Sequence, residues 1–194
     1  SSAASDVYKR QYMTYTTGHP DNEQPNYVYF NYVDINDLKL KDVRGKVLSK
    51  IQDGPHRVSK QADYISAYRQ AVAEHSNYRN WVWDVAIDAK ENPAIAMVRI
   101  DPDKTNHNYY YVKWTGKEWK KTFLGYGGNH FHQTPDTERC YSGGMSIDKQ
   151  HPEQVYCSVP VKGDNGTVYE IVRYSVDDNG NCLLYTSDAA DDKA

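Results

Sequence analysis

A β-hairpin is predicted by residues 81–99, which read Trp-Val-Trp-Asp-Val-Ala-Ile-Asp-Ala-Lys-Glu-Asn-Pro-Ala-Ile-Ala-Met-Val-Arg. The first eight residues are rich in aromatic and β-branched side chains, which suit a half-buried strand. Asn92-Pro93 is a turn signal, and the apolar run that follows it has the length of a second strand. We therefore expect Trp81–Asp88 to pair antiparallel with Ala94–Arg99.

The hairpin begins a unit that recurs sixty residues further along the chain. In the first copy, two more β-rich runs follow, at residues 109–114 and 119–123. The second copy matches the first at three places: Ile147-Asp148 with Ile87-Asp88, Val172-Arg173-Tyr174 with Val112-Lys113-Trp114, and Pro152 with Pro93 one place short. Each copy is predicted to be a meander of three or four antiparallel strands, with Met145–Asp148 paired to Val155–Ser158.

Such meanders cannot bury both faces alone, and their radial stacking gives a β-propeller. Upstream, Met13–Thr16 and Tyr27–Val33 are β-rich runs on either side of a turn cluster, and we expect neighbouring strands there. The predicted fold class is all-β, a partial β-propeller with about three blades. A β-sandwich is the alternative, although it does not require a repeat offset of sixty. Apolar residues at helical spacing predict a short helix within residues 61–74.

The composition narrows the possible partners. The net charge is −3, and charges of both signs are mixed along the chain. The sequence therefore lacks the basic patch that a nucleic-acid-binding protein needs. No apolar run approaches the length needed to span a bilayer. We expect the protein to be a monomer that binds neither nucleic acid nor a membrane. The 18 tyrosines and 4 tryptophans suit both half-buried strands and sugar-facing clefts.

The two ends of the chain are predicted to be translated adapter sequence. Asp6–Gln11 can be encoded by a string whose reverse complement, read from its second base, encodes Cys182–Ser187. Codons for Ser1–Ser5 likewise reverse-complement into codons for Ser187–Asp191. One nucleotide sequence would therefore flank the insert on both sides, and it resembles a transposase mosaic-end adapter in a metagenomic sequencing library. We expect residues 1–11 and 182–194 to be artefact and residues 12–181 to be an internal fragment.

A His-x-His…Cys cluster suggests a metal site. His130 and His132 point the same way on an extended strand, and imidazole with thiolate is a zinc-type ligand set. With Cys140 they would hold a structural zinc at about 2.0–2.3 Å, and a fourth ligand could be His19 or His151. Alternatively, the two histidines face sugar in a cleft beside Tyr126 and Phe131.

The native cysteines are predicted to be unbonded. A hairpin centred between Lys149 and His151 places Cys157 opposite a residue near Gly143, which leaves Cys140 about 10 Å further along its strand. A disulfide needs Cα atoms within about 7 Å. Elsewhere, Asp34, Asn36, Asp37 and the loop 101–108 lack the spacing of a calcium loop, and we interpret them as turn residues.

Several motifs together resemble the BNR-4 repeat family of propellers. They are Trp81–Asp88, Asn92-Pro93 with Arg99, the pair of runs between Tyr109 and Trp119, Tyr141–Asp148, and Thr17–Pro20 followed by Asn26–Tyr29. The resemblance implies a propeller of seven blades. The family includes ulvan lyases, which cleave uronate-containing polysaccharide by β-elimination.

The resemblance also implies roles for individual residues. Arg99 matches a carboxylate-binding arginine, because a guanidinium meets a carboxylate through two hydrogen bonds. Tyr141 and His130 would lie near the cut bond as catalytic residues. Trp83 stands sixteen residues before Arg99, where the lyases lead us to expect a catalytic tyrosine, and a tryptophan cannot transfer the proton. We expect substrate-binding roles for four aromatic or imidazole side chains: Trp83, His19, Tyr126 and His132.

The resulting hypothesis is a secreted or periplasmic carbohydrate-active enzyme that acts on an anionic polysaccharide by β-elimination. A non-catalytic glycan-binding propeller and a sialidase-like glycoside hydrolase are the alternatives. The structural alternative for Arg99 is an ion pair with Asp88 or Asp101, and Tyr141 could simply pack at the start of its blade.

Overall fold

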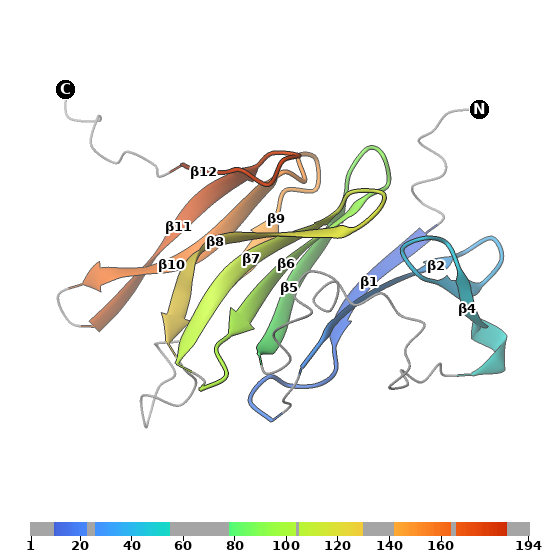
Figure 1. Ribbon diagram of the computed structural model, residues 1–194, viewed down its shortest axis with the longest axis horizontal. Coiled ribbons are helices and arrows are strands. Elements are labelled where there is room, and N and C mark those ends of the chain that lie inside the picture. The colour runs from blue at the N-terminus through green and yellow to red at the C-terminus, as the bar shows by residue number, and fades with distance from the viewer. Residues whose placement is uncertain are drawn as a thin grey trace.

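The computed structural model describes residues 10–22, 26–54, 78–103, 105–129, 142–163 and 166–185. These residues form three antiparallel sheets of four strands each, which lie side by side in chain order (Figure 1). The first sheet contains β1 (Arg10–Thr16), β2 (Val28–Asp34), β3 (Lys39–Lys41) and β4 (Val47–Lys50), and a 3₁₀ turn follows at Ile51–Asp53. The second contains β5 (Arg79–Ile87), β6 (Pro93–Ile100), β7 (Asn106–Trp114) and β8 (Trp119–Asn129). The third contains β9 (Met145–Ile147), β10 (Gln154–Gly163), β11 (Gly166–Val176) and β12 (Cys182–Tyr185).

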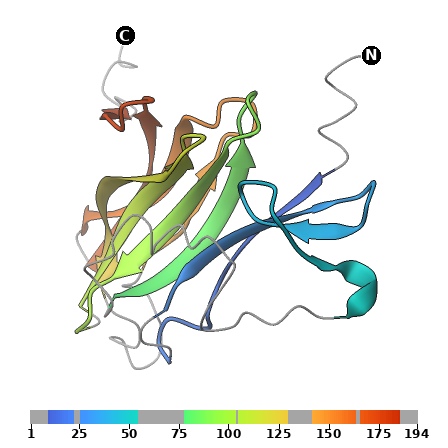
Figure 2. The same ribbon diagram turned by 45° about the vertical axis from the view of Figure 1, so that its right-hand side comes forward.

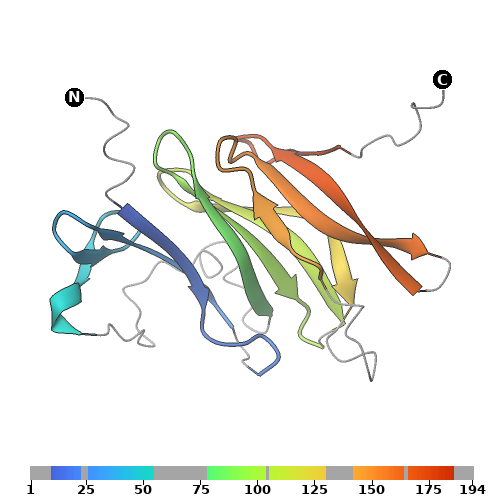
Figure 3. The same ribbon diagram turned by 180° about the vertical axis from the view of Figure 1, so that it is seen from behind.

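Each sheet is one blade of a partial propeller, as the repeat predicts. We name the sheets blade 1, blade 2 and blade 3 in chain order. The oblique view and the view from behind show the blades fanned about the edge that carries β1, β5 and β9 (Figures 2 and 3). β1 lies against β5, and β5 lies against β9. The expected pairing of the runs at 13–16 and 27–33 is confirmed by the β1–β2 ladder.

The β5–β6 hairpin forms as predicted because an aspartate organises its turn. The Asp88 carboxylate accepts hydrogen bonds from the backbone N–H groups of Lys90 and Asn92, at 2.9 and 2.8 Å. Glu91 adopts the left-handed conformation with φ 63°, which closes the turn. The strands then pair from Arg79 opposite Ile100 down to Ile87 opposite Pro93.

The β9–β10 hairpin also forms, but its register differs from the prediction. Cys157 lies opposite Met145, two residues from Gly143, because the turn from Asp148 to Gln154 is centred on His151. Cys157 is a free thiol with 1% of its surface exposed, so the prediction that it is unbonded is confirmed.

The repeat offset holds in part. Val112 lies opposite Ile95 and Val172 lies opposite Cys157, so these two valines are equivalent. The match of Pro93 with Pro152 is wrong: Pro93 faces Ile87, and the residue that faces the equivalent Ile147 is Val155. The β9–β10 turn is two residues longer than the β5–β6 turn, and this insertion shifts the offset within the hairpin.

Two apolar layers hold the blades together. Between blades 1 and 2, side chains of β2 pack on β6 and β7 around a pair of tryptophans: Val28, Phe30, Tyr32, Ile95, Met97, Val112, Trp114 and Trp119. Between blades 2 and 3, small and aromatic side chains alternate: Ala86, Ala94, Ala96, Val98, Tyr109, Tyr111, Met145, Ile147, Val155, Cys157, Val172 and Tyr174. The two faces of β6 therefore serve different neighbours, with alternate residues buried on each side.

Other expectations have mixed outcomes. Asp34 and Asp37 accept hydrogen bonds from turn amides, so their interpretation as turn residues is confirmed.

The helix predicted within residues 61–74 lies outside the described residues. β1 begins inside the predicted adapter range and β12 lies wholly within it, but these strands do not test the nucleotide origin, which stays a prediction. Among the described residues there is no helix long and apolar enough to cross a membrane.

Candidate functional site

Polar residues gather at one end of the blades, which we call the site end. It is the end marked by Gly18, Asn80, Ile100 and Gly128, opposite the turn at Asp88. Across blade 2, residues that face each other on neighbouring strands lie on the same side of the sheet. Successive partners at the site end make a row across all four strands: Asn80 on β5, Arg99 on β6, Asn108 on β7 and Tyr126 on β8. This row faces blade 1.

Arg99 is a buried cation in this row, with 6% of its surface exposed. Its guanidinium carbon lies 3.3 Å from the ring centre of Tyr78 and 5.8 Å from that of Tyr110. Neither expected ion pair forms: Asp88 pairs with Lys113 at 2.8 Å, and Asp101 accepts a hydrogen bond from the Asn106 amide.

Two buried polar atoms of this row have no hydrogen-bond partner in the described part of the chain. They are Nε of Arg99 and Oδ1 of Asn80. Leaving a buried donor unsatisfied costs about 1–3 kcal/mol, and more for a charged group. No carboxylate among the described residues pairs with Arg99. A bound anion would stabilise this arginine.

Tyr110 is, beside Tyr78, a titratable neighbour of Arg99. Burial raises the pKa of the Tyr110 phenol, and the nearby Arg99 charge only partly offsets this effect. The phenol therefore keeps its proton at neutral pH, which suits a proton donor.

A second group lies along β5 at the inner edge of the blades. The His19 and Trp81 rings are 5.7 Å apart, and the Trp81 and Trp83 rings are 5.1 Å apart. Trp83 occupies a bulge between Val82 and Asp84, and 37% of its surface is exposed. Gly144 of blade 3 lies beside the Trp83 ring, and a Cβ on it would be 3.4 Å from the indole. The structure thus brings together two of the four expected substrate-binding residues, through a third aromatic ring.

The loop that carries His19 is fixed by buried polar side chains. The Asn26 amide donates to the carbonyl oxygens of Gly18 and Asn80, at 2.9 and 2.8 Å. Arg79 donates to the carbonyl oxygens of Pro20 and Asp21, at 2.9 and 2.7 Å. These bonds tie blade 1 to the start of β5 and hold the imidazole against Trp81.

Blade 3 meets the site end through a buried histidine that sequence reasoning missed. His107 of β7 is fully buried, and its Nδ1 lies 3.1 Å from Oγ of Ser142. Beside it, the Tyr109 hydroxyl donates to the Ser158 carbonyl at 2.6 Å and accepts from the Gly144 N–H at 3.2 Å. The row across blade 2 could have been found only from the strand register, since Asn80, Asn108 and Tyr126 are far apart in sequence.

Four expected site residues lie outside the described residues: His130, His132, Cys140 and Tyr141. The zinc site and the catalytic roles of His130 and Tyr141 therefore stay predictions. Within the described ranges, no group of three or more potential metal ligands occurs.

Comparison with known proteins identifies the family. No curated protein and no solved structure shows significant similarity to the chain. The sequence pattern described as "BNR repeat-containing family member" matches residues 2–126. This range includes the whole of blade 1 and most of blade 2, with Arg99, His19, Trp83 and Tyr126. Together with the three four-stranded blades, the match shows that the chain belongs to the BNR repeat-containing family of propeller-like, carbohydrate-related proteins.

Proposed function

We propose that the protein acts on an anionic, uronate-containing polysaccharide by β-elimination. The observation that carries the proposal is Arg99, a buried guanidinium without a carboxylate partner among the described residues. A sugar carboxylate would supply the missing charge and hydrogen-bond acceptors. The exposed indole of Trp83 offers an apolar face for a sugar ring. The His19 ring beside Trp81 adds a polar edge to the same surface.

The reaction needs three groups around the sugar. Arg99 neutralises the carboxylate, which makes the proton on the adjacent carbon easier to remove. A base takes that proton, the electron pair forms a carbon–carbon double bond, and the bond to the leaving oxygen breaks. Tyr110 gives its proton to the leaving oxygen, and the nearby Arg99 cation favours the phenolate that remains. We assign the base to Tyr141 or His130 from the family resemblance.

The test measures product formation and binding separately. Formation of the unsaturated uronate is followed by its ultraviolet absorbance on a panel of soluble uronate polysaccharides. Arg99→Ala should lower kcat/KM by about 100-fold or more, whereas Arg99→Lys should retain part of the binding. Tyr110→Phe should lower kcat by about 100-fold and leave KM nearly unchanged.

Arg44→Ala is the matched control. Arg44 also lies over an aromatic ring, 4.9 Å from the centre of Trp114, but it belongs to the turn end of the blades. Its loss should not change activity. Elimination that survives in Arg99→Ala at the wild-type rate would refute the proposal.

A non-catalytic glycan-binding propeller is the second candidate, favoured by Trp83. This residue stands where the resemblance leads us to expect a proton-transferring tyrosine, and it offers an exposed stacking surface instead. Uronate binding that depends on Arg99, without any unsaturated product, would select this function. Both candidates imply a secreted or periplasmic location, because uronate polysaccharides lie outside the cytoplasm.

A further inference from the structure

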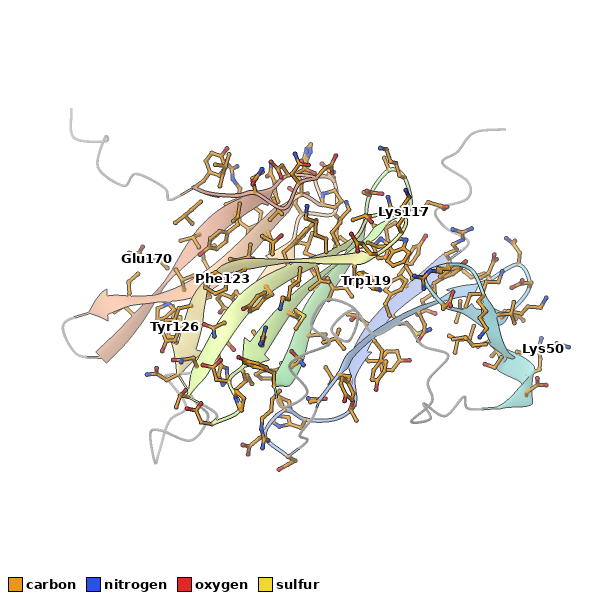
Figure 4. All side chains as sticks on the ribbon, in the orientation of Figure 1. Lys50, Lys117, Trp119, Phe123, Tyr126 and Glu170 are labelled. Atoms are coloured by element: carbon orange, nitrogen blue, oxygen red, sulfur yellow. The ribbon has the colours of Figure 1, made fainter. Side chains whose placement is uncertain are left out.

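β8 carries two exposed aromatic side chains on the face that also holds Arg99. Phe123 and Tyr126 are 53% and 41% exposed. Both lie on the strand that borders blade 2 on its outer side (Figure 4). An exposed phenylalanine on a sheet face leaves apolar surface in water, and two such aromatic rings together form a surface suited to a ligand.

The two rings share a face because β8 bulges between them. Residues three apart on a regular strand point to opposite faces. Here Tyr110 lies opposite Phe123 and Tyr109 lies opposite Gly125, so Leu124 is left without a partner. Leu124 turns instead into the layer between blades 2 and 3. The bulge thus places both aromatic rings on the side that faces blade 1.

These rings continue the site outward from Arg99. Asn108 lies opposite both Arg99 and Tyr126, and the rings of Tyr110 and Phe123 are 5.4 Å apart. From β6 to β8 is two strand spacings, about 10 Å. Cations lie along this path: Arg99 at its inner end, and the Lys121 ammonium 4.9 Å from the centre of the Tyr110 ring.

We propose that Phe123 and Tyr126 form an additional sugar-binding subsite for a polysaccharide chain that runs outward across blade 2 from Arg99. The inference rests on the proposed function and specifies its substrate as a polymer rather than a short oligosaccharide. The two rings stack on sugar faces beyond the residue whose carboxylate Arg99 binds. The cations along the path match the repeated negative charge of a uronate chain.

The test compares long and short uronate chains on the full 194-residue protein. Phe123→Ala and Tyr126→Ala should each weaken binding of a soluble polyuronate by about threefold to tenfold, with less effect on its disaccharide. Tyr156→Ala is the matched control, because Tyr156 is 38% exposed on β10 of blade 3. It should bind both ligands as the wild type does. Unchanged thermal unfolding midpoints would show that all three variants are folded.

Each outcome decides a different claim. If Arg99→Ala abolishes polyuronate binding while Phe123→Ala and Tyr126→Ala change nothing, the subsite is refuted and the proposed function stands. Equal losses for polymer and disaccharide would also refute the subsite as an outward extension. If the wild type binds a neutral polysaccharide as well as the polyuronate and both β8 variants lose it, the stacking subsite holds and the anionic substrate is refuted. Absence of any binding by the wild type would refute both.

Discussion

Replacing Asp84 with alanine should loosen the contact between blades 2 and 3. The Asp84 carboxylate, placed by the bulge at Trp83, accepts hydrogen bonds from the backbone N–H groups of Ile147 and Val85, both at 2.8 Å. Lys149 also donates to it and to the carbonyl oxygen of Val85. Asp84 thus clamps the first strand of one blade to the first strand of the next.

The magnitude follows from these contacts. A hydrogen bond to a charged group contributes about 1.5–3 kcal/mol, and the half-exposed Lys149 ion pair adds about 0–1 kcal/mol. Since the Asp84 side chain is 22% exposed, water replaces part of the lost bonding. We expect Asp84→Ala to lower the free energy of unfolding by about 2–4 kcal/mol, and the melting temperature by about 5–15 °C.

The assay is urea unfolding with hydrogen exchange of the Ile147 amide. Asp84→Asn keeps an acceptor for one N–H group and should lose about half as much stability as Asp84→Ala. Asp103→Ala removes an exposed turn aspartate that bonds Thr105, and it should change stability by less than about 0.5 kcal/mol. An alanine variant within that same margin of the wild type, or an unchanged exchange rate at Ile147, would refute the clamp.

Three further substitutions or conditions test the packing and charges of the blades. Gly127→Ala would place a Cβ 2.7 Å from the Tyr109 ring and should cost about 1–3 kcal/mol in urea unfolding. Burial alone would raise the pKa of Asp88, but Lys113 and the turn amides hold it below its ordinary value. A lowered folded-state pKa contributes stability above the unfolded pKa that is lost on acidification, so Asp88→Asn should show a shallower loss below about pH 4. Burial raises the pKa of the Cys157 thiol, so a thiol reagent should modify it slowly in the native protein and rapidly in urea.

The sequence was sufficient to predict most of the longer strands and their order, because hydrophobic runs and turn residues are local signals, but it did not predict β3 or β12. The hairpins at Asp88 and Asp148 and the neighbouring strands of blade 1 follow from such signals alone. The register was harder to predict. The turn after Asp148 carries two extra residues, and this difference moved Cys157 from the expected partner to Met145.

The candidate site was predicted less well than the fold, because bulges decide which side chains meet. Strict alternation along β5 would put Asp84 on the face of Val82, whereas the bulge at Trp83 turns Asp84 toward blade 3. The bulge at Leu124 places Phe123 and Tyr126 on one face in the same way. A bulge adds one residue without a strong local signal, so neither arrangement could be predicted from periodicity.

The two ends of the blades have different structural roles. At the turn end, one turn recurs in all three blades, after Asp42, Asp88 and Asp177. In each, the carboxylate accepts two backbone N–H bonds, and the fourth residue, Gly45, Glu91 or Gly180, has a positive φ. This turn satisfies its own polar groups, so it stabilises a hairpin whatever lies beside it.

At the site end the buried polar groups satisfy one another between blades, and some are left without a partner. Asn26 bonds Asn80 across blades 1 and 2, and His107 contacts Ser142 across blades 2 and 3. Unsatisfied polar atoms on Arg99 and Asn80 cost stability that the self-contained turns at the other end do not lose. Trp119 Nε1 at the turn end and Arg173 Nε in blade 3 also lack a partner among the described residues, so an unsatisfied atom alone does not mark the site. Arg99 combines an unsatisfied Nε with a buried charge, two aromatic neighbours and a place in the site-end row, and this combination is what supports the proposed anionic ligand.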